Sequence, residues 1–134
     1  MRSYTFSAPI KLPGLNEYTY ACRSHAQIGA ALKRDTEDAL RWFIRAQLGK
    51  LVKDKKLPAR APVKVYFRWT EAGKRPRDKD NIAFAKKFVL DALVAEKVLL
   101  SDAWDYVDSF EDSFFRGPRY GVTVDITVLD KEKD

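Results

Sequence analysis

Four segments of the chain carry the hydrophobic patterns and turn signals that predict β-strands. Hydrophobic residues recur at every second position in residues 4–10, Val63–Trp69 and Tyr120–Leu129, which predicts strands with one buried face. The fourth segment is Tyr106–Phe115. The last two segments flank Gly117–Pro118, a turn signal, so we expect them to form a hairpin.

Two longer segments show the helical spacing of three to four residues. The first runs from about Ala26 to Lys53, with one apolar stripe and no proline. The second is expected to begin with Asp80 or Asn81 as its N-cap and to continue to about Lys97. Residues 16–23 follow a Pro-Gly pair and are expected to form a loop.

The element order is therefore β-α-β-α-β-β, which predicts an α+β fold, a two-layer sandwich with one mixed sheet packed by two helices. A chain of 134 residues, of which 46% are hydrophobic, suits a single domain spanning residues 1–134. No apolar run reaches membrane-spanning length, the first residues lack a signal peptide's hydrophobic stretch, and Cys22 is the only cysteine. We therefore expect a cytoplasmic protein with a reduced thiol and no membrane partner.

The net charge of +6 is unevenly distributed along the chain. Residues 50–87 contain 13 Lys or Arg and 4 Asp or Glu, whereas residues 88–134 contain 5 and 11. A basic segment attracts phosphates whatever the nucleotide sequence, so this asymmetry favours a nucleic-acid partner. A basic surface that only keeps the protein soluble is the alternative.

Three carboxylates border the second predicted helix, Asp78 and Asp80 before it and Asp102 after it. In an extended segment, residues two apart project to the same side, so Asp78 and Asp80 are expected to converge. Carboxylate oxygens are the ligands that Mg²⁺ prefers, and a bound metal activates water for phosphodiester hydrolysis. The basic residues around the first pair are candidates for binding nucleic acid: Lys74, Arg75, Arg77 and Lys79.

Lys87 is a further candidate on the second predicted helix. At about 100° per residue, Asp80, Lys87 and Asp91 share the face that the core does not use. Lys87 would point back toward the first two acids, where a cation could orient water or offset charge on the phosphate. Each feature has a structural alternative: Asp78 and Asp80 as caps, Lys87–Asp91 as an ordinary helical pair, and Asp102 as a polar loop residue.

Other chemistries lack the residues that they need. His25 and Cys22 are the only histidine and cysteine, so the chain offers neither a nucleophilic triad nor a zinc site. His25 is expected at the surface, where the first helix starts. No G-x-x-x-x-G-K-S/T motif is present, so no nucleotide cofactor is expected.

Several aromatic residues lie outside the predicted core stripes. Tyr18 and Tyr20 accompany Arg23 in the predicted N-terminal loop, and Trp104 follows the third acid. They could stack on bases at a DNA branch point, with Arg23 binding nucleic acid, and packing in the core or a dimer interface is the alternative. Trp42 lies off the stripe of the first helix and could face a partner subunit.

The string D-x-D-N at Asp78–Asn81, a helix with lysine and D-A-L, and a following D-A-W resemble the motif of the RusA family of Holliday-junction resolvases. P-G-L-N-E-Y near the start and V-T-V-D-I-T-V-L near the end extend the likeness to nearly the whole chain. The resemblance implies a homodimer, often prophage-encoded, that binds branched four-way DNA and cuts paired strands symmetrically with Mg²⁺ or Mn²⁺. By motif position, Asp78, Asp80 and Asp102 would be the metal-binding catalytic acids and Lys87 the catalytic lysine.

Two positions depart from the family pattern. Phe84 stands four residues after the second Asp, where the family has its lysine, and counting back from D-A-L assigns that role to Lys87 in preference to Lys86. Ser101 replaces the first acid of a family D-D pair, which leaves Asp102 alone there. Two other functions remain open: a metal-dependent nuclease of the same fold acting on flaps, forks or RNA, and a DNA-binding protein that does not cut.

Overall fold

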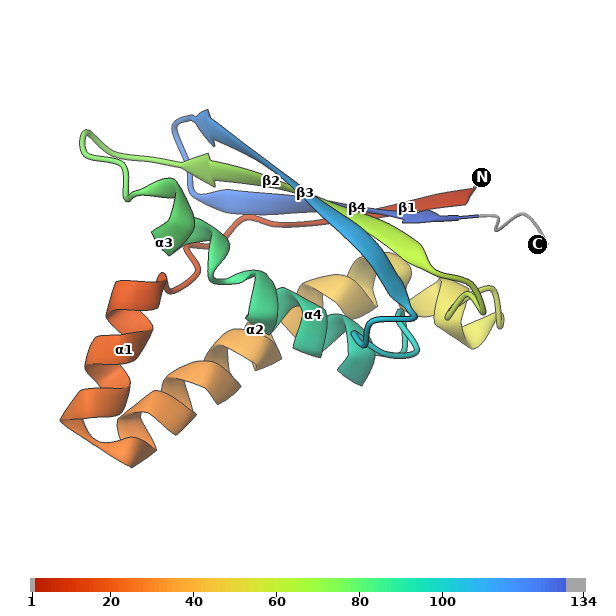
Figure 1. Cartoon of the computed structure of the whole chain (residues 1–134), viewed down its shortest axis with the longest axis horizontal. Helices are drawn as coiled ribbons and strands as arrows, with labels where there is room; N and C mark the ends of the chain where they lie inside the picture. The colour runs from red at the N-terminus through yellow and green to blue at the C-terminus, as the bar shows by residue number, and fades with distance from the viewer. Residues whose placement is uncertain (1, 130–134) are drawn as a thin grey trace.

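The computed structural model describes residues 2–129 and confirms an α+β fold with one four-stranded sheet. Its elements in chain order are β1 (Arg2–Ala8), α1 (Leu15–Ser24), α2 (Ala26–Lys53), β2 (Val63–Glu71), α3 (Lys79–Ala83), α4 (Lys86–Ala95), β3 (Val107–Arg116) and β4 (Gly121–Val128). The sheet order is β1-β4-β2-β3, and only β2 and β3 run parallel. The helices lie together on one side of the sheet, which makes two layers (Figure 1).

The core lies between the sheet and α2 and α4. In the central strands, Phe67 of β2 and Val124 of β4 are fully buried. Leu40 and Ile44 from α2 and Leu93 from α4 are equally buried against them. The stripe predicted for Ala26–Lys53 is thus confirmed as the face that meets the sheet. No helix within residues 2–129 is both long enough and apolar enough to span a membrane.

The predicted N-terminal loop is instead a helix, α1, so this prediction is wrong. Gly14 is its N-cap, and the Gly14 amide donates to the Glu17 carboxylate at 3.5 Å. The helix ends at His25, whose extended backbone separates α1 from α2 and whose Nδ1 accepts from the Gln27 amide at 3.1 Å. α1 is only ten residues long and directly follows the turn signal Pro13–Gly14, so the sequence favoured a loop there.

The second predicted helix is broken into α3 and α4, and its N-cap is Asp78 rather than Asp80 or Asn81. The break comes at Phe84–Ala85, where the amides of Ala85, Lys87 and Phe88 bond to carbonyls three residues back, as in a 3₁₀ turn. Asn81 does not cap the helix because its side-chain oxygen accepts from the Asn16 amide at 2.9 Å instead.

The predicted hairpin of the last two strands is also wrong. β3 and β4 are not neighbours, because β2 lies between them and pairs with both. Four alternate residues of β4 are at most 3% exposed, which suits a central strand, whereas β3 carries acids and lies at the edge. The turn at Gly117–Pro118 therefore crosses the end of β2, where the Gly117 amide donates to the Glu71 carbonyl.

Candidate functional site

Asp78 and Asp80 lie in the first turn of α3, and both are exposed. The Asp78 side chain makes no capping hydrogen bond, although its carbonyl accepts from the Ile82 amide at 3.0 Å. The Asp80 carboxylate accepts only from the adjacent Asn81 amide at 2.9 Å, and within residues 2–129 neither acid forms an ion pair. The simple capping explanation therefore fails for Asp78, and both carboxylates can take a ligand from solvent.

The position of α3 is fixed from the side of α1. The Asn81 side chain accepts from the Asn16 amide, and Gly14 lies so close that a Cβ there would be 2.5 Å from the Asn81 side-chain oxygen. Only glycine permits this approach without movement of Asn81. Gly14 and Asn81 therefore position the acidic turn, a role that the sequence pattern alone did not reveal.

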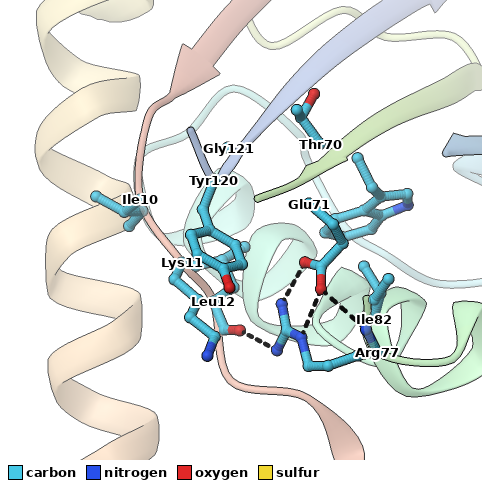
Figure 2. Close-up of a pocket in the computed structure, with 10 residues that line it drawn as sticks. Ile10, Lys11, Leu12, Thr70, Glu71, Arg77, Ile82, Tyr120 and Gly121 are labelled. Carbon is cyan, nitrogen blue, oxygen red and sulfur yellow. Dashed lines mark hydrogen bonds and ion pairs between the residues drawn. The ribbon is translucent and has the colours of Figure 1, made fainter. Parts of the chain in front are cut away.

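Arg77 anchors the same turn from the sheet side. Its guanidinium donates to Glu71 at 2.7 and 3.0 Å, to the Leu12 carbonyl at 2.8 Å and to Glu17 at 3.0 Å. Figure 2 shows the Arg77 guanidinium between Glu71 and the Leu12 carbonyl, with Tyr120 alongside. The cavity beside it measures about 10 Å³, room for one water at most, so these residues form a structural brace rather than a ligand pocket.

The opposite charges of Arg77 and Glu71 stabilise each other. Burial opposes ionisation of Glu71, but hydrogen bonds and charge from Arg77 outweigh burial and lower the pKa of the Glu71 carboxyl. Hydrogen bonding to Glu71 raises the pKa of Arg77. Arg77 was predicted to bind nucleic acid, yet its donors are engaged inside the protein. The signal in the sequence was Glu71, a charged residue that continues the buried alternation of β2.

Lys87, in the first turn of α4, forms ion pairs with both Asp91 of the same helix and Asp102 beyond its end. Its ammonium lies 3.2 Å from Asp91 and 3.4 Å from Asp102. Hydrogen bonding to Asp91, aided by the charge of both acids, raises the pKa of Lys87, so its amine is protonated at neutral pH. The predicted meeting of Lys87 with Asp91 is confirmed, and the structure adds Asp102 as a second partner.

Lys86 has a different environment. Its ammonium lies 2.7 Å from Asp112 on β3 and sits over the rings of Phe67 and Phe110. Asp112 also accepts from the Trp69 indole at 2.8 Å. Lys86 therefore links α4 to the sheet, which leaves Lys87 as the lysine that faces the acids and solvent.

The other basic residues that were predicted to bind nucleic acid lie in two different parts of the structure. Lys74, Arg75 and Lys79 are exposed on or beside the loop between β2 and α3, next to the acidic turn. Arg23 lies in the last turn of α1, about 13 Å along the helix from the end that contacts α3. Lys74, Arg75 and Lys79 thus border the acids, whereas Arg23 does not.

The aromatic residues that were predicted to contact DNA differ in how far they are buried. Tyr18 is half-buried and packs against Phe84 and Phe88 at the margin of the core. Tyr20 is 76% exposed and Trp104 93% exposed, so neither is a core residue.

The donors fit a hard metal ion only in part. Within residues 2–129, no three Asp, Glu, His or Cys side chains are close enough to form a ready-made metal cluster. Asp78 and Asp80 are exposed oxygen donors, and Mg²⁺ commonly binds one or two carboxylates, completing its octahedron with water and phosphate oxygens. Asp102 is instead engaged by Lys87, so the structure does not join it to the first two acids.

Neither protein-family models nor curated proteins match this chain. The features of the molecule that bear on its function are therefore the acidic turn at Asp78 and Asp80, the basic residues beside it, and Lys87 with its partners Asp91 and Asp102.

Proposed function

We propose that the protein is a Mg²⁺-dependent endonuclease that cuts branched DNA, a four-way junction resolvase of the RusA kind. The observation that carries the proposal is the acidic turn, in which the carboxylates of Asp78 and Asp80 are exposed to solvent and form no ion pair within residues 2–129. Asn81 and Arg77 hold this turn in place from either side. A protein that needed these acids only for stability would be expected to bond them to its own amides or cations.

The basic residues beside the turn supply attraction to DNA. Lys74, Arg75 and Lys79 can bind phosphates on either side of the scissile bond, and this attraction is independent of nucleotide sequence. Such contacts position the backbone but do not select a branch point. Selection would come from the shape of the substrate, and the exposed ring of Trp104 is available to stack at an unpaired base.

In this mechanism Asp78 and Asp80 would hold the metal ion, which when bound would supply an activated water and neutralise phosphate charge. Lys87 is protonated and holds Asp102 in the free protein. As negative charge develops on the phosphate, the Lys87 ammonium would stabilise it, and Asp102 would keep the amine oriented.

The test is cleavage of a labelled four-way junction, a linear duplex and a flap, each with Mg²⁺ or with EDTA. Asp78→Asn and Asp80→Asn keep the size and capping ability of the acids but remove their charge. Asp35→Asn is the matched control, because Asp35 is an exposed helical acid on α2 and its one ion pair within residues 2–129 is with the neighbouring Arg34 at 3.8 Å. We expect paired, metal-dependent cuts in the junction, retained by Asp35→Asn and lost in both site variants.

Other outcomes would replace the proposal. Junction binding without cutting under Mg²⁺ or Mn²⁺ would identify a DNA-binding protein with structural acids. Equal cutting of all three substrates would retain the nuclease and remove the junction preference. Mn²⁺ titration by calorimetry without DNA provides a separate readout: Asp78→Asn should weaken binding and Asp35→Asn should not.

A further inference from the structure

Three segments far apart in the sequence supply positive charge at one end of the sheet. Residues 8–16, 72–77 and 113–120 contain no Asp or Glu, and each contains Lys or Arg. The Arg116 guanidinium donates to the Gly73 carbonyl, so the connection from β3 to β4 lies beside the loop that follows β2 (Figure 1). The tertiary structure therefore gathers cations that the sequence keeps apart.

The N-terminal segment reaches the same end of the sheet. The Lys11 ammonium lies 5.0 Å from the centre of the Tyr120 ring, and Figure 2 shows the two side chains near each other. A Cβ added at Gly73 would lie 3.5 Å from the Tyr120 hydroxyl. Tyr120 is therefore close both to Lys11 and to the loop that follows β2.

The cations at this end are exposed and have no acidic partner in the described part of the chain. None of five forms an ion pair within residues 2–129: Lys11, Lys74, Arg75, Arg116 and Arg119. Neighbouring cations without acids attract phosphate groups whatever the nucleotide sequence. Arg75 precedes Asp78 by three residues, which span at most about 11 Å, so these cations begin beside the acidic turn.

An aromatic ring is exposed at the same end of the sheet. Phe115 is 50% exposed and pairs in register with Thr70 of β2. A groove of about 190 Å³ is lined by Thr70, Thr123 and Arg119, so Phe115 lies beside a surface with hydroxyl groups and a cation. The bases of a duplex are already stacked on one another, whereas an unpaired base can stack on a protein ring. An exposed ring next to cations is therefore typical of a surface that binds single-stranded nucleic acid.

From these observations we propose that this end of the sheet binds a single-stranded segment of DNA. Phe115 stacks on one unpaired base, and the cations around it bind phosphates of the same strand. The surface leads that strand into the acidic turn at Asp78, and in this respect its role rests on the proposed nuclease function. The preferred substrate is then a branch with unpaired nucleotides next to the cut. We name the surface the sheet-end surface, and its members are Lys11, Lys74, Arg75, Phe115, Arg116 and Arg119.

Equilibrium binding in EDTA tests the sheet-end surface separately from cleavage. Fluorescein-labelled oligo(dT) should bind more tightly than a duplex of the same length. Phe115→Ala should weaken oligo(dT) binding about tenfold, as expected for the loss of one base stack, and leave duplex binding unchanged. Phe115→Leu keeps most of the bulk but removes the ring, and should have the same effect. Phe110→Ala is the matched control, because Phe110 is 45% exposed on the same strand but lies nearer its other end.

The salt dependence of oligo(dT) binding tests the cations. Arg119→Ala should reduce the slope by about 0.7, the value for one phosphate contact with a single strand. Arg60→Ala is the matched control and should leave the slope unchanged, because it removes the same charge from an exposed arginine before the opposite end of β2.

Four results would each overturn the proposal: duplex bound as tightly as oligo(dT), an equal loss from Phe110→Ala, no effect of either change at Phe115, or an equal change of slope from Arg60→Ala. The proposed nuclease is judged separately, by cleavage with Mg²⁺. If the binding results are as expected but no substrate is cut, the sheet-end surface stands and the nuclease fails. Junction cleavage by a protein that does not prefer oligo(dT) to duplex would give the reverse.

Discussion

The brace between Arg77 and Glu71 offers the sharpest test of how the acidic turn is held. Arg77→Met keeps most of the aliphatic stem but removes every side-chain donor to Glu71, Glu17 and the Leu12 carbonyl, and leaves only the backbone amide of residue 77 bonded to Glu71 at 3.3 Å. The Glu71 side chain is 6% exposed and that of Arg77 17%, so the remaining carboxylate would be buried without a counter-charge. We expect this substitution to be strongly destabilising and to loosen Asp78, the next residue in the chain.

The magnitude follows from the burial of the pair. Removing one partner of a buried ion pair costs about 3–5 kcal/mol, because the other charge is left uncompensated. For 134 residues, an unfolding entropy of about 2.1 cal/mol/K per residue converts this loss to a decrease of roughly 10–18 °C in melting temperature. The double variant Arg77→Met with Glu71→Leu should recover much of the loss, because no buried charge remains.

Urea denaturation at several pH values measures the effect and its cause. In the wild-type protein, the lowered pKa of Glu71 means that its contribution is complete above its ordinary value and is lost as the pH falls through the folded pKa. In Arg77→Met, burial is opposed only by the backbone amide of residue 77 and the charge of Lys11, so the neutral form of Glu71 is favoured more than in the wild type and the deficit relative to wild type should shrink on acidification.

A loss of less than about 1 kcal/mol for Arg77→Met at neutral pH would refute this reasoning, because that is the range of exposed pairs. A deficit that does not change with pH would show that the lost contacts, and not the charge of Glu71, determine the cost.

Three further predictions concern the site itself. Gly14→Ala should lower stability by about 1–3 kcal/mol in urea melts and reduce junction cleavage, because its Cβ would meet the Asn81 side chain at 2.5 Å. Lys87→Met should change stability by less than about 1 kcal/mol but slow cleavage about 100-fold in single-turnover assays, whereas Lys86→Met should chiefly destabilise the fold. Arg75→Ala should reduce the salt slope of junction binding by about 0.9 in a fluorescence titration, and an unchanged slope would remove Arg75 from the DNA interface.

Much of the fold followed from local patterns. The stripe of α2 and the alternation of β2 and β4 predicted those elements, because burial of one face imposes a period that neighbouring residues reveal. The acidic string before α3 and the spacing from Lys87 to Asp91 were equally visible, since both are short-range features. The exposure of Trp42, which is 64%, also agrees with its place off the apolar stripe.

Which distant segments contact one another was determined only by the tertiary structure. Whether β4 pairs with β3 or β2 depends on which strand fills the centre of the whole sheet, and adjacency in sequence favoured the wrong answer. Arg77 was indistinguishable from its basic neighbours until β2 placed Glu71 beside it. Asn81 was a plausible cap until α1 offered it the Asn16 amide. Local periodicity reports which face of a segment is buried, but the partner that covers that face is selected by the free energy of the complete fold.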